Sequence, residues 1–354
     1  ANLGPMCHIR RVSNVSERPA KHFHTSSAAV SLGVLDIAQM SEDEAERAFE
    51  QIRFAKTSGE PHCVWCDCEV AYRITRKVAN RKTGEIRHRR LFKCKKCLKQ
   101  FSVTSGTAFH SRKLSFKKIM LATLLWVNGE SGHAGLRLKR DLRCNHKTGW
   151  QIGQRLRHTI TSYVTSELVE GDFEMDTTFI GGVVRKANEA SLRAKQPRRD
   201  ESKVVALSVM RERRKGGRIV PFLGDESALG KVIHHHVDIE AHPYVDEHKA
   251  WNVLDAIFPE VSRIKHKERY SDLNGVSTNL AESYFSRFKR MYRGIYFSFS
   301  GQYAHVYNGE GTWRERHCRI SNGEKFVNAL AGALHHPPTP MRGYYQRTRK
   351  RAAA

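Results

Sequence analysis

Two C-x-x-C pairs form the most specific local pattern in the sequence, because thiolates at this spacing are typical metal ligands. The first pair is Cys63 and Cys66, the second is Cys94 and Cys97, and the 27 residues between them are enough for a hairpin. Four thiolates in tetrahedral arrangement suit Zn²⁺, and they fill every coordination position, so we expect a structural ion. Three nearby side chains are alternative ligands: Cys68, His62 and His88.

Three acids supply a second set of possible metal ligands. Asp176 lies in the stretch "GDFEMDTTFIGG", whose alternation turns its side chain away from the face of Phe173 and Met175. Asp246 ends a short strand-like run in "PYVDEHKAW", and Glu282 belongs to the helical segment "STNLAESYFSRFKRMYRG". Carboxylates are the ligands that hard cations such as Mg²⁺ prefer. A solvated residue at a strand edge is the simpler alternative for Asp176.

The helical segment around Glu282 has one apolar and one polar face. The apolar arc consists of Leu280, Tyr284, Phe288 and Met291, and the opposite arc consists of Glu282, Ser286, Lys289 and Arg293. A helix of this kind can pack on a sheet and offer polar groups to a metal and to phosphate. An alternative requires no catalysis, since Asn279 as N-cap and Glu282 three residues later form a capping box.

The charge balance indicates a polyanionic partner. The 354 residues include 61 Lys and Arg against 36 Asp and Glu, which gives a formal net charge of +25 and a pI near 9.9. A protein that is merely basic is the alternative. No apolar run approaches the roughly 20 residues that cross a bilayer, so no transmembrane helix is predicted. The cysteine usage favours metal binding in a reducing compartment over a disulfide framework.

The segment between the second cysteine pair and Asp176 has the pattern of several short helices. Its proportions suit a helix-turn-helix with a basic last helix from about Lys147 to Arg157. Lys147, Arg155 and Arg157 are therefore candidates for DNA contact, although a helical linker would show a similar pattern.

From Phe173 onward the sequence has the pattern of an α/β domain. Three strand-like runs, "DFEMDTTFIGG", "SKVVALSVMRE" and "GRIVPFLG", precede alternating helical and strand-like segments. This order predicts a mixed β-sheet flanked by helices. At the other end of the chain, Ser41 and Glu44 mark the start of a helix. Residues 1–40 superficially resemble a transit peptide and are expected to be poorly ordered.

Several of these motifs occur together and in order in one family. The segments "EMDTTFIGG", "YVDEHKAW", "STNLAESYFSRFKR" and "TWRERHCRISNG" resemble the DDE transposases of bacterial insertion sequences related to the Merlin elements, the fifteen-ninety-five group. The resemblance spans about Met40 to Leu334 and implies a multidomain α/β protein with an RNase H-like sheet. The expected parts are a leader at 1–40, an N-terminal helix at 41–60, a zinc ribbon at 61–110, a helix-turn-helix domain at 111–165, an RNase H-like catalytic domain at 170–335 and a basic tail at 336–354.

The resemblance also implies the catalytic residues. The first family aspartate corresponds to Asp176, the second to Asp246 and the third acid to Glu282, which would together hold two Mg²⁺ or Mn²⁺ ions. Some relatives use Asn as the third residue, so Asn279 remains an alternative, and His266 matches a supporting position. Basic residues after the third acid, Lys289 and Arg293, would contact the DNA backbone.

The implied activity is Mg²⁺-dependent DNA strand cleavage followed by attack of the 3′-hydroxyl on target DNA. The expected partners are the terminal inverted repeats of an insertion sequence, target DNA and further copies of the chain in a dimer or larger assembly. The expected location is the prokaryotic cytoplasm, at the nucleoid. The alternative is a catalytically inactive DNA-binding regulator derived from a transposase, with the zinc ribbon and helix-turn-helix retained.

Overall fold

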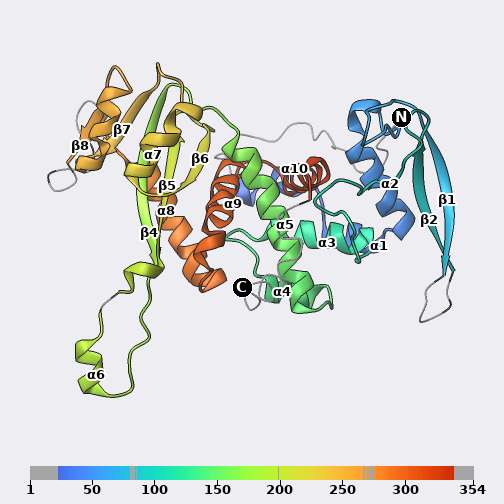
Figure 1. Ribbon diagram of the computed structural model, residues 1–354, viewed down its shortest axis with the longest axis horizontal. Coiled ribbons are helices and arrows are strands. Elements are labelled where there is room, and N and C mark those ends of the chain that lie inside the picture. Colours follow the sequence, from blue (N-terminus) through green and yellow to red (C-terminus); the bar gives the residue numbers. More distant parts are fainter. Residues whose placement is uncertain are drawn as a thin grey trace, which may run out of the picture. The chain divides into compact units, whose positions relative to one another are not determined.

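The chain forms two compact units. The computed structural model describes residues 23–79, 84, 86–197, 199–265, 268, 271 and 275–338 (Figure 1). One unit combines Ala1–Asn128 with Arg319–Ala354, and the other is Gly129–Cys318. The polypeptide therefore leaves the first unit after Asn128 and returns to it at Arg319. We call these the ribbon unit and the sheet unit.

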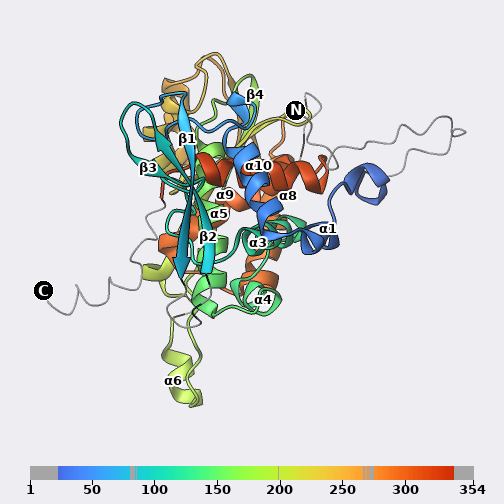
Figure 2. The same cartoon turned by 90° about the vertical axis from the view of Figure 1, so that its right-hand side faces the viewer.

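Helices from both ends of the chain build the core of the ribbon unit. They are α1 (Val34–Gln39), α2 (Glu42–Arg53), α3 (Phe116–Asn128) and α10 (Asn322–His335). Helix α10 packs against α2 and α3 (Figure 2). The ring of Phe49 lies 4.9 Å from that of Phe116 between centroids. Capping boxes that begin at Ser41 and Ser321 start α2 and α10, which confirms the helix start expected at Ser41.

Part of the expected leader is folded. The amide of Asn322 accepts a hydrogen bond from the Ser31 N–H at 2.9 Å and donates one to the Leu32 carbonyl at 2.6 Å. Ile37 in α1 is fully buried. The expectation of poor order therefore does not hold for residues 31–39, because the segment finds its partner in a helix near the other end of the chain. Residues 1–22 of the leader and 339–354 of the basic tail lie outside the described residues.

A three-stranded antiparallel sheet carries the cysteine pairs. Its strands are β1 (Ala71–Ala79), β2 (Ile86–Cys94) and β3 (Gln100–Phe101), in the order β1-β2-β3. The ring of Phe92 packs against those of Phe54 and Phe101, at 5.7 and 5.3 Å between centroids. Strand β3 pairs only with Phe92 and Lys93, so the outer part of the β1–β2 hairpin has two strands.

The sheet unit contains the predicted mixed sheet. Its strands are β4 (Asp172–Gly181), β5 (Val204–Glu212), β6 (Ile219–Leu223), β7 (His242–Asp246) and β8 (Ser262–Ile264). They lie in the order β6-β5-β4-β7-β8; β5 is antiparallel to β4 and β6, whereas β7 is parallel to β4 and β8. The three strand-like runs of the sequence are confirmed as β4, β5 and β6. This is a mixed sheet flanked by helices, as expected for an RNase H-like domain.

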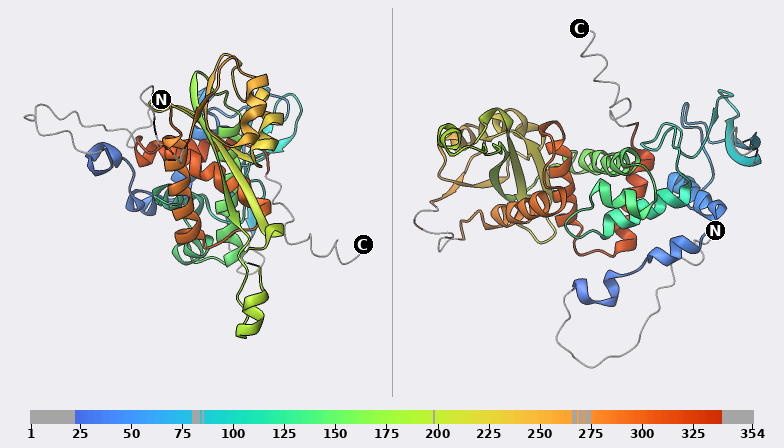
Figure 3. Two further views of the ribbon diagram at one scale, coloured as in Figure 1. Left: turned by 90° about the vertical axis from the view of Figure 1, so that its left-hand side faces the viewer. Right: turned by 90° about the horizontal axis from the view of Figure 1, so that it is seen from below.

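Six α-helices accompany this sheet within the described part of the chain. They are α4 (Gly135–Asp141), α5 (His146–Thr165), α6 (Ala190–Lys195), α7 (Glu226–Val232), α8 (Asn279–Met291) and α9 (Ala304–Arg316). Helix α8 lies along β4 and β5 (Figure 3). Short 3-10 turns occur at Phe23–Thr25, Ser27–Ala29, Ala55–Thr57, Glu201–Lys203, Ile233–His235, Lys249–Ala256 and Gly301–Tyr303, and a π-helical turn at Tyr292–Tyr296.

The two faces of the sheet bury different side chains, as strand alternation requires. Phe173, Met175 and Val245 belong to one core cluster. The α8 face buries Val209 and Tyr284 in the other cluster. The even-numbered residues of β4, among them Asp176, therefore point toward the face that α8 covers.

The segment predicted as a helix-turn-helix is divided between the units. Helix α3 belongs to the ribbon unit, and α4 and α5 belong to the sheet unit. Helices α4 and α5 pack so closely at Gly135 and Gly149 that a Cβ added to Gly149 would lie only 2.7 Å from the Gly135 carbonyl oxygen. Helix α5 also packs on α9. A DNA-reading role for α4 and α5 stays a prediction.

Candidate active site

The four predicted zinc ligands come together in the ribbon unit. The Sγ atoms of Cys63, Cys66, Cys94 and Cys97 all lie within 4.8 Å of one another. Two Sγ pairs, Cys63 with Cys97 and Cys66 with Cys94, are 3.6 Å apart. Tetrahedral Zn²⁺ with Zn–S bonds of about 2.3 Å places its sulfurs about 3.8 Å apart. The cluster therefore fits a structural zinc ion, and Cys68 lies outside it.

Asp176 and Asp246 lie on neighbouring parallel strands of the sheet unit. The register of β4 and β7 pairs Glu174 with Tyr244. Continued by two residues, the same register brings Asp176 level with Asp246 on strands about 4.8 Å apart. Val245 is buried in the core on the other face, so both carboxylates are on the side of α8. Residues 70 positions apart in sequence thus become neighbours.

The charges of Asp246 and Glu282 both act on Asp176. The pKa of the Asp176 carboxyl is raised to about 7, mainly by burial and also by these two negative charges, whereas the Thr177 N–H and the cation of Lys289 lower it. The Thr177 N–H donates to Oδ1 of Asp176 at 2.7 Å. The surroundings of Asp176 therefore disfavour its charged form. A bound cation would stabilise the charged form.

Asp246 is held by its own loop. The indole Nε1–H of Trp251 donates to Oδ1 of Asp246 at 2.6 Å, and the His248 N–H donates to the same oxygen at 3.1 Å. The ring of Trp251 is itself buried in the core beneath the sheet. Both hydrogen bonds go to Oδ1 and fix the orientation of the carboxyl group. The other oxygen, Oδ2, accepts neither of these two bonds.

Glu174 is a buried acid of β4 that the sequence interpretation did not single out. Its buried side chain points to the same face as Asp176, two residues further along β4. Its Oε2 accepts hydrogen bonds from the Leu280 N–H at 2.7 Å and the Ala281 N–H at 3.1 Å. These are N–H groups of the first turn of α8, which have no partner within the helix. Glu174 on β4 therefore binds the first turn of α8, the helix that carries Glu282.

This contact takes the place of the capping box that the sequence offered as an alternative role for Asn279 and Glu282. The N-cap residue of α8 is Thr278, without a side-chain cap, and Asn279 is the first helical residue. The capping carboxylate comes from a strand more than 100 positions away, so no local motif signals it. The one sequence signal for this contact was that Glu174 stands two residues before Asp176, so both acids lie on the same face of β4.

The remaining predicted site residues are Lys289, Arg293, Asn279 and His266. The charge of Lys289 acts on Asp176, so this lysine is near the acid cluster. Lys289, Arg293 and Asn279 are exposed. His266 lies outside the described residues.

The basic residues of α5 have different environments. Lys147 is exposed near the start of the helix, and Arg155 is partly buried. Arg157 is only 2% exposed, and its Nε donates to Glu310 at 2.6 Å. A guanidinium that is enclosed and paired in this way does not present its charge to DNA. The prediction that Arg157 contacts DNA is therefore wrong, because α9 covers the face of α5 from which it extends.

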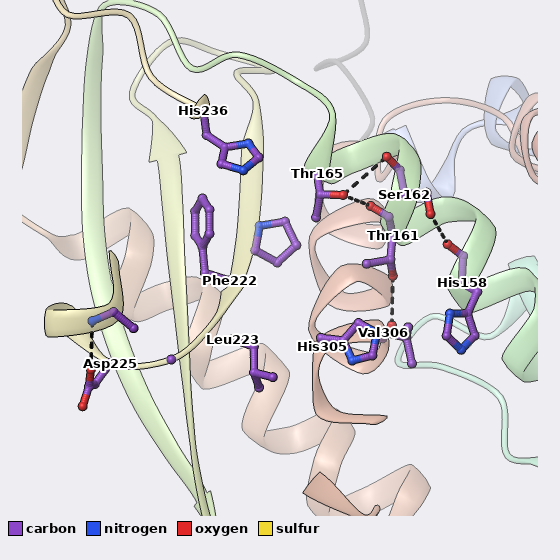
Figure 4. Close-up of a pocket in the computed structure, with 13 residues that line it drawn as sticks. His158, Thr161, Ser162, Thr165, Phe222, Leu223, Asp225, His236, His305 and Val306 are labelled. Carbon is purple, nitrogen blue, oxygen red and sulfur yellow. Dashed lines mark hydrogen bonds between the residues drawn. The ribbon is translucent and has the colours of Figure 1, made fainter. Parts of the chain in front are cut away.

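A cavity of about 460 Å³ lies elsewhere in the sheet unit, among α5, β6, α7 and α9 (Figure 4). Three histidines, His158, His236 and His305, contribute to its lining. None of the three acids lines it, so the cavity is separate from the acid cluster.

The cysteine cluster and the mixed sheet fit one class of protein, the zinc-ribbon transposases with an RNase H-like sheet. Residues 168–316 match the family model of the ISXO2-like transposase domain, and residues 40–100 match that of the transposase zinc-ribbon domain. The chain belongs to this family of ISXO2-like transposases. No curated protein gives a significant match to it. Among the described residues, no helix combines the length and apolar character needed to cross a membrane.

Proposed function

We propose that this transposase cuts DNA at the ends of a mobile element and joins the freed 3′-hydroxyl to target DNA. The observation that supports this proposal most strongly is that Asp246 and Glu282 both act on Asp176, whose pKa is raised by burial and by these two charges. Three carboxylates brought together beside a lysine destabilise one another unless cations bind among them.

The chemistry of the donors suits magnesium. Carboxylate oxygens are the ligands that hard divalent cations prefer. Asp176, Asp246 and Glu282 would hold the ions. When bound, the ions would activate the attacking oxygen and stabilise the leaving oxygen at the scissile phosphate.

The protein's own groups prepare this site. Trp251 and Glu174 fix Asp246 and α8 before substrate arrives, so little reorganisation is needed during reaction. Lys289 on α8 and Arg293 in the π-helical turn that follows it are both exposed and would hold the DNA backbone near the cut. Lys147 and Arg155 are the remaining candidates on α5 for contacts with the terminal repeats. Both ends of the element must be joined, which requires at least two copies of the chain.

Cleavage of a duplex that carries the element's terminal repeat tests the proposal. We expect nicking and strand transfer in Mg²⁺ by the full-length protein, and loss of both in Asp176→Asn with DNA binding retained. Glu247→Gln is the matched control, since it removes an exposed carboxylate next to Asp246 and should leave activity unchanged.

Each contrary outcome has a distinct meaning. DNA binding without cleavage in any divalent ion would reject the enzyme and support the transposase-derived regulator. Cleavage without strand transfer would identify a nuclease instead.

A further inference from the structure

The outer half of the β1–β2 hairpin is a two-stranded ribbon with no covering layer. Its register pairs run from Thr75 with Arg90 to Ala79 with Ile86, beyond the reach of β3. Val78 is 43% and Ile86 is 62% exposed. An isolated two-stranded hairpin is marginally stable in water. An extension of this length with both faces exposed therefore points to a partner that lies outside the ribbon unit's own core.

The ribbon is strongly basic. Residues 71–94 contain nine Lys and Arg and one acid, Glu85. Arg76 lies directly opposite Arg89 across the two strands, on one face. Like charges in this position destabilise a hairpin. Among the described residues, no carboxylate pairs with Arg76, Lys77 or Arg89.

The arginines of the hairpin that lie nearer the core do have acidic partners. Arg73 of the inner half pairs with Glu50 at 2.6 Å, and Arg90, at the inner end of the outer half, pairs with Asp43 at 3.1 Å and Glu46 at 3.5 Å. Acids of α2 thus neutralise the arginines nearest the core. Arg76 and Arg89 have no such partner among the described residues, so their mutual repulsion is left for a polyanion to relieve.

We propose that the outer half of the hairpin, Thr75–Ala79 with Ile86–Arg90, lies in the major groove of duplex DNA, with the face of Arg76 and Arg89 toward the base edges. This inference rests on the proposed function and adds a second DNA-contacting element to it. The major groove, about 12 Å wide, admits a two-stranded ribbon. Arginine forks match the N7 and O6 acceptors of guanine in that groove. Five residue pairs at about 3.4 Å per residue reach roughly 17 Å, the length of about five base pairs.

Two variants of the full-length protein test this placement. Arg76→Gln with Arg89→Gln removes two charges from the proposed groove face. Lys77→Glu changes the charge by the same two units on the opposite face of the same hairpin, at an exposed residue. We expect the first variant to bind terminal-repeat duplex at least about tenfold more weakly, a modest value for two base-contacting arginines. The second should lose clearly less. Equal losses, or no loss in the first variant, would overturn the placement.

The groove is tested by changing the DNA. Replacing guanine by 7-deazaguanine removes the N7 acceptor from the major groove and leaves the minor groove unaltered. Wild-type binding should weaken on this DNA, whereas the Arg76 and Arg89 variant should be insensitive to it. A wild-type protein that binds both duplexes equally would refute major-groove insertion.

Binding is measured without divalent metal, and zinc content and thermal unfolding confirm that each variant is folded. These binding results are independent of cleavage. A hairpin that fails the test while Mg²⁺-dependent cleavage persists leaves the proposed function intact. A hairpin that passes while the wild type never cleaves would leave the inference standing and reject the enzyme.

Discussion

The carboxylate of Glu174 accepts a hydrogen bond from the Leu280 N–H at 2.7 Å and so joins the central strand of the sheet to the first turn of α8. The same strand carries Asp176, and the same helix carries Glu282. One buried side chain thus sets the position of two acids relative to each other. The Arg211 guanidinium adds a second connection, since it donates to the Leu280 carbonyl at 3.0 Å from β5.

Replacing Glu174 should slow cleavage without weakening DNA binding. Glu174→Ala removes the acceptor of the Leu280 N–H and of the buried Ala281 N–H, and a buried N–H without a partner costs about 1–3 kcal/mol of stability. A shift of α8 by about 1 Å lowers catalysis on the order of 100-fold. We also expect a higher Mg²⁺ concentration for half-maximal cleavage, an effect that a loss of stability alone would not produce.

Glu174→Gln is the control for this prediction, because it keeps an acceptor oxygen and should retain more activity than the alanine variant. An alanine variant with wild-type rate and wild-type Mg²⁺ dependence would show that α8 is positioned without Glu174.

Asp176 should make the metal-free protein less stable as the pH rises from about 4 to 7. Its folded pKa of about 7 is above that of an unfolded aspartate, near 3.9, so the folded state holds a proton in this range that the unfolded state has lost. Stability therefore falls across this window and levels off above it. Asp176→Asn should show a weaker fall and should be the more stable protein at pH 8.

Thermal unfolding with chelator present, measured from pH 4 to 8 in wild type and variant, checks this expectation. The same trace in both proteins would mean that Asp176 ionises freely. Added Mg²⁺ should raise the wild-type midpoint at pH 8 more than that of the variant.

Loss of one cysteine of the cluster should unfold the zinc ribbon. Cys63→Ser removes a ligand, and structural zinc contributes about 10–16 kcal/mol to the folding of small zinc domains. We expect zinc to be lost together with the β signal of the ribbon, by metal analysis and circular dichroism. Cys68→Ser is the matched control, since Cys68 lies outside the cluster. Zinc retained at full occupancy in Cys63→Ser would contradict this ligand set.

Arg157 should prove to be a stability residue. Its side chain donates to Glu310 and, at 2.9 Å, to the hydroxyl of Tyr296. Removal of one partner from a buried ion pair costs about 3–5 kcal/mol, so Arg157→Ala should lower the unfolding midpoint strongly. Lys147→Ala, on the exposed start of the same helix, should change stability by less than about 0.5 kcal/mol while weakening DNA binding. An Arg157→Ala protein of wild-type stability would argue against the buried pair.

The sequence by itself determined the local features of the chain. Cysteine spacing identified the zinc ligands, and alternation identified β4 and the direction of Asp176, since both signals lie within a few neighbouring residues. Motif order along the chain was enough to indicate the family.

Tertiary structure decided what no local pattern contains. It placed Asp246 beside Asp176, supplied Glu174 as the cap of α8 in place of Asn279, enclosed Arg157 under α9, and brought α10 back to the N-terminal helices. Each of these contacts joins residues far apart in sequence, and its energy comes from burial and pairing that exist only after the chain has folded. A helical wheel shows which side of α5 is basic, but only the packed neighbour decides whether that side meets water, DNA or Glu310.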